Sequence, residues 1–140
     1  MAETERAAQR LAAVLVPPGV VLVRGPLGAG KTTFVRALLR AEGVVEMVKS
    51  PTFDLVHPHR GDGRRFLHVD LYRLQPVPPP EELDVDGGDA LVLVEWGEAW
   101  APFWPDRVEV SLSPRDGDAR QIVVVGFGAW ASRLERWAAA

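Results

Sequence analysis

The chain has 140 residues, 47% of them hydrophobic and 25% charged, which is typical of a globular protein with a buried core. Its formal net charge of −3 argues against a broad nucleic-acid-binding surface, which would be basic. The absence of cysteine excludes disulfides and thiolate chemistry, and the apolar runs are shorter than the ~18 residues of a membrane span.

The first predicted element is a helix from Thr4 to Leu15, with Thr4 as a candidate N-cap and apolar residues at helical spacing. Residues 1–10 are charged and lack the apolar segment of a secretory signal, so we expect a cytoplasmic protein. Pro17-Pro18-Gly19 ends the helix. The short apolar run at residues 20–23 then predicts a buried strand.

A glycine-rich segment follows this strand and precedes a helix predicted from Thr33 to about Glu42. Its sequence, Gly25-Pro26-Leu27-Gly28-Ala29-Gly30-Lys31-Thr32, matches the phosphate-binding P-loop pattern G-x-x-x-x-G-K-[ST]. Glycines let the backbone curl so that amide N–H groups converge on an anion, and the helix N-terminus adds partial positive charge. We therefore expect a nucleotide to be bound by Gly28, Ala29, Gly30, Lys31, Thr32 and Thr33, with the Thr32 hydroxyl on Mg²⁺.

Two strands are predicted next, at residues 53–57 and 65–72, after Gly43 has ended the helix. A turn around Gly61-Asp62-Gly63 joins them. The proline-rich segment 75–80 is expected to be a loop that leads into a short helix at Glu81-Glu82-Leu83.

The remaining sequence predicts a buried strand at residues 90–94 that ends in Glu95, a β-hairpin with strands around 108–113 and 122–125, and a helix at about 129–138. Strands are many and crossover helices are few. We therefore expect an α/β, P-loop NTPase-like fold with a mixed parallel and antiparallel central sheet flanked by helices. Residues 1–140 are expected to form a single P-loop ATPase domain.

A P-loop needs an acid at the end of a neighbouring strand to hold Mg²⁺, and the sequence offers Asp70 and Glu95. Glu95 follows the more apolar run and has no other evident role. The run before Asp70 is interrupted by His68, which predicts a less buried face there. A carboxylate that faces water is the alternative for each acid.

Other side chains carry weaker signals. Ser50-Pro51-Thr52 lies about twenty residues after the P-loop, where many nucleotide-binding proteins keep a loop that senses the γ-phosphate. Thr52 is therefore a candidate to bind Mg²⁺ or to position water, and a plain proline turn is the alternative. Trp96 follows Glu95 and is expected beside the nucleotide. The histidines lack metal-ligand spacing, so we expect them at the surface or in satisfied hydrogen bonds.

The chain resembles the TsaE (formerly YjeE) family over residues 4 to 125, roughly. Beside the P-loop, the segments that carry the resemblance are Lys49-Ser50-Pro51-Thr52-Phe53, His68-Val69-Asp70-Leu71-Tyr72-Arg73-Leu74 and Leu93-Val94-Glu95-Trp96. Members of this family are small bacterial P-loop ATPases of tRNA threonylcarbamoyladenosine biosynthesis. The resemblance implies ATP, ADP and Mg²⁺ binding and weak intrinsic ATPase activity.

The resemblance also implies partners. The protein would act with the TsaB–TsaD complex, which transfers the threonylcarbamoyl group to adenosine 37 of tRNAs that read ANN codons. It would reset that complex through ATP binding or hydrolysis, so tRNA would be contacted only indirectly.

By the same resemblance, Thr32 and Glu95 are the Mg²⁺ positions. Asp70 is the strand acid near the site and our candidate general base, and Thr52 belongs to a switch-like loop. Thr4 corresponds to a nucleotide-contacting position.

The sequence departs from the family pattern at three places. Pro26 stands where an acidic residue is common, and Ala8 stands where a glycine is usual. The proline run at residues 76–80 lies where the family is usually shorter.

Two alternatives remain for a P-loop protein of this size. A small-molecule kinase usually needs a lid with arginines and a second substrate pocket, and no clear lid segment is present in the sequence. A non-hydrolysing module whose interactions are gated by nucleotide would differ in releasing no stoichiometric phosphate when its partners are present.

Overall fold

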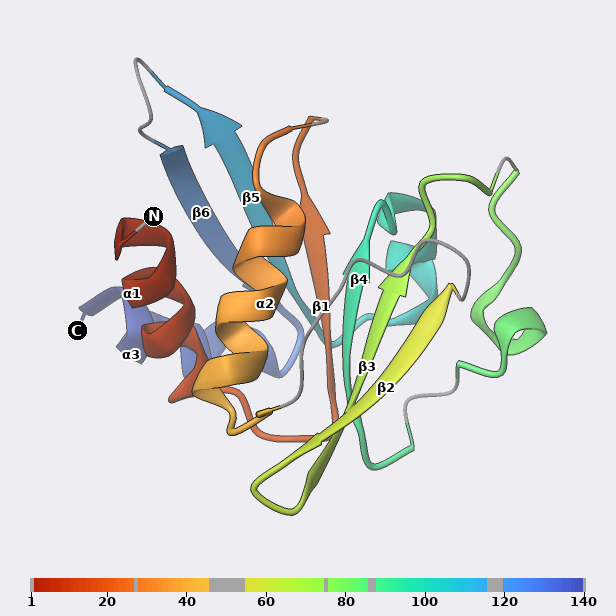
Figure 1. The fold of residues 1–140 in the computed structure, drawn as a ribbon, viewed down its shortest axis with the longest axis horizontal. Coiled ribbons are helices and arrows are strands. Elements are labelled where there is room, and N and C mark those ends of the chain that lie inside the picture. Colours follow the sequence, from red (N-terminus) through yellow and green to blue (C-terminus); the bar gives the residue numbers. More distant parts are fainter. Residues whose placement is uncertain are drawn as a thin grey trace.

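The computed structural model describes residues 2–26, 28–45, 55–74, 76–85, 88–115 and 120–139. Its centre is a six-stranded sheet with the strand order β2-β3-β4-β1-β5-β6 (Figure 1). The elements in chain order are α1 (Ala2–Ala12), β1 (Gly19–Arg24), α2 (Lys31–Ala41), β2 (Val56–Gly61), β3 (Arg64–Asp70), the 3₁₀ helix η1 (Pro80–Leu83), β4 (Leu91–Glu95), the 3₁₀ helix η2 (Glu98–Phe103), β5 (Arg107–Pro114), β6 (Arg120–Phe127) and α3 (Trp130–Ala139).

The sheet is mixed, as predicted. Strands β3, β4, β1 and β5 run parallel, while β2 and β6 are antiparallel edges. All five residues of β4 are buried, because the strand lies between two neighbours with both sheet faces covered. Parallel strands end at the same edge of a sheet, so the P-loop after β1 is brought beside the ends of β3 and β4.

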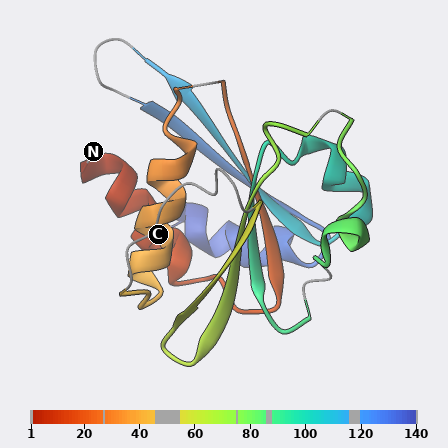
Figure 2. The ribbon, with the colours of Figure 1, turned by 45° about the vertical axis from the view of Figure 1, so that its right-hand side comes forward.

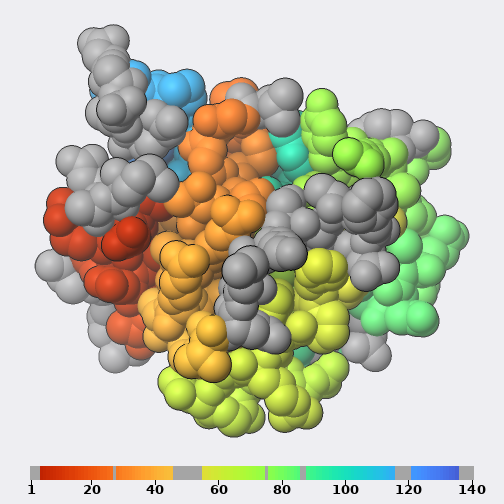
Figure 3. Space-filling view, viewed as in Figure 1, coloured from red at the N-terminus to blue at the C-terminus, as the bar shows by residue number. Residues whose placement is uncertain are grey.

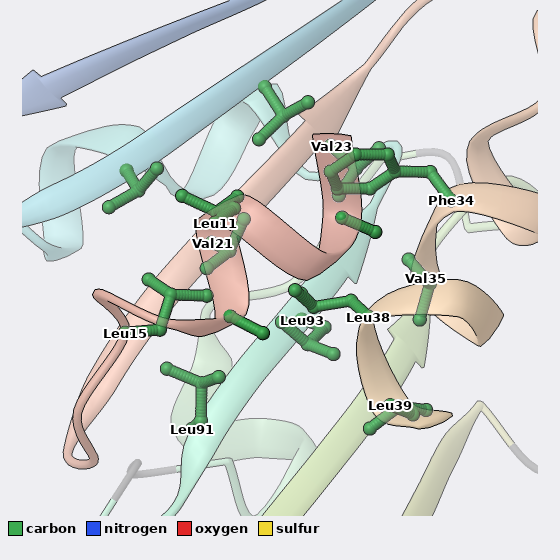
Figure 4. Close-up of a cluster of buried hydrophobic side chains, with 14 of the residues drawn as sticks. Leu11, Leu15, Val21, Val23, Phe34, Val35, Leu38, Leu39, Leu91 and Leu93 are labelled. Atoms are coloured by element: carbon green, nitrogen blue, oxygen red, sulfur yellow. The ribbon is translucent and has the colours of Figure 1, made fainter. Parts of the chain in front are cut away.

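One face of the sheet packs on the α-helices. Phe34 and Leu38 of α2, Leu11 of α1 and Leu93 of β4 have no exposed surface and belong to one apolar cluster, to which Trp130 of α3 also contributes. Figure 4 shows side chains of α1 and α2 meeting those of β1 and β4. This packing fixes the position of α2, whose first turn follows the P-loop.

The opposite face is covered by shorter elements. Leu22, Val69 and Val94 pack there with Trp100 of η2, whose indole N–H donates to the carbonyl of Pro78 at 2.7 Å. Figure 2 shows α1 and α2 on one side of the sheet and the 3₁₀ helices on the other. In the described segments, no helix has the length and apolar character that crossing a membrane requires.

Several element boundaries differ from the sequence prediction. Helix α1 starts at Ala2, so Thr4 lies within its first turn and the predicted N-cap role is wrong. Strand β3 ends at Asp70, because the chain turns at residues 72–73. Strand β2 spans Val56–Gly61, later than predicted, while residues 53–54 lie outside the described part of the chain.

The end of α2 confirms the prediction for Gly43. Its φ of 92° places it in the left-handed region, where glycine is favoured. The Gly43 N–H donates to the Arg40 carbonyl at 3.1 Å and the Val44 N–H to the Leu39 carbonyl at 3.0 Å. These two bonds form a Schellman motif, which satisfies carbonyls that the helix end leaves without partners.

We expect Leu38→Ala to lower the free energy of unfolding by about 2–5 kcal/mol, because it leaves a cavity between α2 and the sheet. Urea denaturation monitored by circular dichroism measures the change. Val45 is 98% exposed, so Val45→Ala is the control and should alter stability by less than about 0.5 kcal/mol. Equal effects of the two substitutions would contradict the assigned core.

Candidate functional site

The loop between β1 and α2 depends on three glycines. A Cβ at Gly25 would lie 2.5 Å from the carbonyl oxygen of Leu112, so no larger residue fits beside β5. Gly28 and Gly30 have open space around them, but their φ values of 83° and 97° lie in the left-handed region. The glycines thus give the loop its close approach to β5 and its two left-handed bends.

The first turn of α2 presents backbone donors. Gly30 is its N-cap, and the first intrahelical bond runs from the Phe34 N–H to the Gly30 carbonyl at 2.9 Å. The N–H groups of residues 31–33 precede that bond, so they have no intrahelical acceptor and are available to an anion.

Ala29 is arranged differently from its neighbours. Its side chain is only 1% exposed and packs in the core, while its N–H donates to the Pro26 carbonyl at 3.0 Å. Its predicted contact with a nucleotide stays a prediction, and the residue contributes to the shape of the loop.

A cavity of about 400 Å³ lies above the first turn of α2. The structure brings eight sequence-predicted residues to its wall together with Tyr72, and the lining is Gly28, Gly30, Lys31, Thr32, Thr33, Asp70, Tyr72, Glu95 and Trp96. In the space-filling view, the loop before α2 (orange) and the segment after β3 (green) flank a small area of the chain around the end of β4 (teal) (Figure 3). Tyr72 was not singled out from the sequence, although it lies in the motif that contains Asp70.

Glu95 joins two neighbouring elements through its two carboxylate oxygens. The Thr32 hydroxyl donates to Oε1 at 2.7 Å, and His68 Nε2 lies 2.6 Å from Oε2. His68 has no exposed surface, so the prediction that its face of β3 is less buried is wrong. The physical reason is that β3 is an interior strand whose His68 lies opposite Leu93 in β4, on the face that α2 covers.

The Lys31 ammonium is held by the loop itself. Its Nζ donates to the carbonyls of Gly25 at 2.7 Å and Pro26 at 2.9 Å, and it lies 3.9 Å from the centre of the Trp96 ring. Burial lowers the pKa of Lys31 below 10.5, against the opposing influence of the Glu95, Glu98 and Asp70 carboxylates. The Lys31 side chain is therefore a partly buried cation. Another acceptor can replace the two carbonyls that it now contacts.

Trp96 has an uncommon backbone conformation, with a φ of 62° in a residue that is not glycine. This turn follows directly on Glu95 and places the indole against Lys31 on one side. The Tyr72 ring lies on it with centroids 4.8 Å apart and planes inclined by 50°. Strained residues of this kind concentrate at functional sites, which supports a role for Trp96 at the cavity.

Asp70 lies beside Glu95, its register partner across β3 and β4. Its Oδ1 accepts the backbone N–H of Tyr72 at 3.0 Å, which fixes the turn that carries the tyrosine to the cavity. The side chain is half-buried and lines the cavity, so the second acid predicted from the sequence lies in the same site as the first.

Besides Ala29, two further predicted residues are not brought to this cavity by the described structure. Thr4 is buried in α1 and is not part of the lining. Thr52 lies outside the described residues. Their proposed contacts stay predictions.

The oxygen donors of Thr32 and Glu95 suit Mg²⁺, which prefers hard oxygen ligands and usually completes its coordination with phosphate and water. Within the described ranges, no three His, Cys, Asp or Glu side chains gather as a metal cluster. The donor set therefore fits a cation that arrives with phosphates better than a cation held by protein ligands alone.

A larger hollow of about 890 Å³ lies at the opposite end of β1, beside Pro17, Pro18, Trp104 and Trp130. Its lining includes none of the residues singled out for nucleotide or metal binding. The smaller cavity is the candidate site because the P-loop, both strand acids and Trp96 meet there.

Comparison with known proteins shows which family the chain resembles. The sequence profile of the TsaE family, described as threonylcarbamoyl adenosine biosynthesis protein TsaE, matches residues 1–122. A protein named tRNA threonylcarbamoyladenosine biosynthesis protein TsaE from Streptomyces coelicolor is 40% identical, with 94% of this chain and 92% of the relative covered. The protein of the same name from Bacillus subtilis is 31% identical, with coverages of 90% and 81%.

A solved structure shows the same architecture. The crystal structure of Bacillus subtilis YdiB superposes with a TM-score of 0.78 at 26% identity and covers 98% of this chain and 88% of that one. This similarity confirms the predicted P-loop NTPase-like fold.

We expect Glu95→Gln to lower the pKa of Lys31 further, because the largest influence opposing burial is removed. NMR titration of lysine labelled at the ε-carbon measures this value. Glu98→Gln should act in the same direction with a smaller effect, and Glu81→Gln on η1 should leave it unchanged. Because the folded-state pKa is below the unfolded value, the Lys31 contribution to stability should rise as pH increases through the interval between them. A rise of the Lys31 pKa in Glu95→Gln would contradict the assignment.

Proposed function

The chain belongs to the TsaE family, and on this premise we propose that it is a Mg²⁺-dependent ATPase of weak intrinsic activity that serves threonylcarbamoyl modification of tRNA. The observation that carries the proposal is the meeting of a P-loop lysine, the free first-turn amides of α2 and the Thr32–Glu95 pair at one cavity. Residues 1–140 act as one ATPase domain in this proposal.

The phosphates of ATP are bound by the first turn of α2. The N–H groups of residues 31–33 lie at the helix N-terminus, and these residues line the cavity, where an anion is also favoured by the helix dipole. The Lys31 ammonium exchanges the Gly25 and Pro26 carbonyls for phosphate oxygens. Phosphate is a stronger acceptor for an ammonium than a carbonyl, because the hydrogen bond then joins two charged groups.

Thr32 and Glu95 are the residues that hold Mg²⁺. When it is bound, the cation neutralises charge that develops on the phosphates. Asp70 borders the same cavity and is our candidate to accept the proton of an attacking water, with Thr52 proposed to position that water. Catalysis of this kind consists mainly of orientation and electrostatic stabilisation.

Partner proteins are proposed from the family alone. The relatives are named as tRNA threonylcarbamoyladenosine biosynthesis proteins, which supports a role in the same modification here. We infer that the protein acts with TsaB and TsaD in the cytoplasm and meets tRNA only through them. ATP binding or hydrolysis would reset that complex, and the transfer of the threonylcarbamoyl group would take place elsewhere in it.

Lys31→Ala is expected to weaken ATP binding by about 10- to 100-fold, because it removes a charge-assisted hydrogen bond to phosphate. Isothermal titration calorimetry of ATP, with Mg²⁺ or with EDTA, measures the loss. Arg40→Ala removes an exposed cation from the last turn of the same helix and should leave the affinity unchanged.

Glu95→Ala is expected to retain ATP binding in EDTA and to lose most Mg²⁺-dependent phosphate release. Wild-type turnover in this variant would reject the metal role of Glu95.

Failure of the wild-type protein to bind adenine nucleotides would reject the proposed function. Rapid phosphoryl transfer to a metabolite would favour a kinase instead, and nucleotide binding without phosphate release in the presence of the partners would favour a gated module.

ATP binding is expected to change the fluorescence of Trp96, because the Lys31 ammonium leaves the face of the indole when it binds phosphate. Titration with ATP in a fluorimeter measures the change. The Trp96→Phe variant should lose this signal, whereas Trp104→Phe, beside the opposite hollow, should retain it. An unchanged signal in Trp96→Phe would show that the change arises elsewhere.

A further inference from the structure

His68 is a buried polar residue whose role follows neither from the P-loop pattern nor from the strand acids. Its side chain has no exposed surface, and its Nε2 lies 2.6 Å from Glu95 Oε2. The other oxygen of the same carboxylate accepts the Thr32 hydroxyl at 2.7 Å. The Glu95 carboxylate therefore has a hydrogen-bond partner on each oxygen, namely Thr32 at the cavity and His68 on the core side.

The sheet register explains how His68 reaches Glu95. His68 lies opposite Leu93, and Asp70 lies opposite Glu95, so the histidine is one side-chain step below the acid on the same face. That face is covered by the apolar cluster that contains Phe66, Leu93 and the side chains of α2. The imidazole thus reaches the Glu95 carboxylate from the core side, where water does not compete for the hydrogen bond.

The surroundings of the two ring nitrogens indicate the tautomer of His68. Its Nδ1 is buried and has no hydrogen-bond partner among the described residues. A bare lone pair in that position is tolerated better than an N–H group, which would be a buried donor without an acceptor. The proton is thereby assigned to Nε2, whose N–H group donates a hydrogen bond to Oε2 of Glu95.

We propose that His68 is a positioning residue, which holds the Glu95 carboxylate with Oε1 directed to Thr32 and to the metal position. The inference rests on the proposed function. The terminal torsion of a glutamate is broad and roughly two-fold, so a carboxylate with only the Thr32 contact would rotate. Partners that orient a ligand in this way commonly change metal affinity 10- to 100-fold when they are removed.

A variant pair separates orientation from packing. His68→Leu fills the buried space but removes the donor, whereas His68→Gln places an amide N–H₂ near the position of Nε2. His59 is another histidine with little exposed surface and lies on β2, so His59→Leu is the matched control. Thermal unfolding by circular dichroism accompanies each variant.

Metal affinity is measured with Mn²⁺ as the probe. Electron paramagnetic resonance follows Mn²⁺ titrated into the ADP complex, and calorimetry in EDTA gives the affinity for ADP alone. We expect His68→Leu to bind Mn²⁺ about 10- to 100-fold more weakly with ADP affinity in EDTA unchanged. His68→Gln should recover to within about threefold of wild type, and His59→Leu should match wild type.

Two results would overturn the proposal. The first is a folded His68→Leu protein with wild-type Mn²⁺ affinity. The second is a His68→Gln protein as defective as His68→Leu, because a packing role alone would then account for the loss.

A measurement without nucleotide keeps this inference separate from the proposed function. Long-range ¹H–¹⁵N NMR of the nucleotide-free protein reports which ring nitrogen of His68 carries the proton. A proton on Nε2 whose signals shift in Glu95→Gln supports the assignment, and a proton on Nδ1 alone overturns it. A wild-type protein that binds no ADP but shows the Nε2 proton would contradict the proposed function and leave the His68–Glu95 contact established.

Discussion

The Glu95 carboxylate is the constraint around which the site is organised. It stands at the end of a strand buried on both faces, and its oxygens contact Thr32 on α2 and His68 on β3. A buried carboxylate without partners would be strongly destabilising, so the residues around it have to supply donors. The first turn of α2 and the end of β3 are thus tied to β4 by the same carboxylate that we propose as a ligand of Mg²⁺.

The strand order makes this arrangement possible. Strand β1 lies between β4 and β5, and β4 lies between β1 and β3, all of them parallel. Their carboxyl ends therefore share one sheet edge, where a P-loop, Asp70 and Glu95 meet although far apart in sequence. Arg24, the last residue of β1, pairs with Glu109 of β5 at 2.9 Å, and Arg107 binds the same carboxylate at 2.7 Å. These contacts hold the strand end from which the loop starts.

The sequence predicted the parts of the site that depend on local patterns. The glycine spacing, the apolar run of β4 and the position of Glu95 at its end were sufficient to place the P-loop and its acids. The burial of His68 was predicted wrongly, because a histidine in a strand signals an exposed face unless its partner across the sheet is known. The contact with Glu95 depends on the register between β3 and β4, which no local pattern contains. For the same reason the sequence did not predict that Tyr72 lies at the site, because its contact with Trp96 depends on the turn after Asp70.

In the proposed function, phosphate binding is a displacement reaction, because the Lys31 ammonium already has hydrogen-bond acceptors within the loop. In this conformation the Gly25 and Pro26 carbonyls and the Trp96 ring contact the Lys31 ammonium in the way that a phosphate would. An incoming anion competes with contacts that the chain already makes with itself, so apparent affinity falls below that of a loop with its cation free. A change that removes one of these internal contacts would therefore strengthen phosphate binding without adding any contact to the ligand.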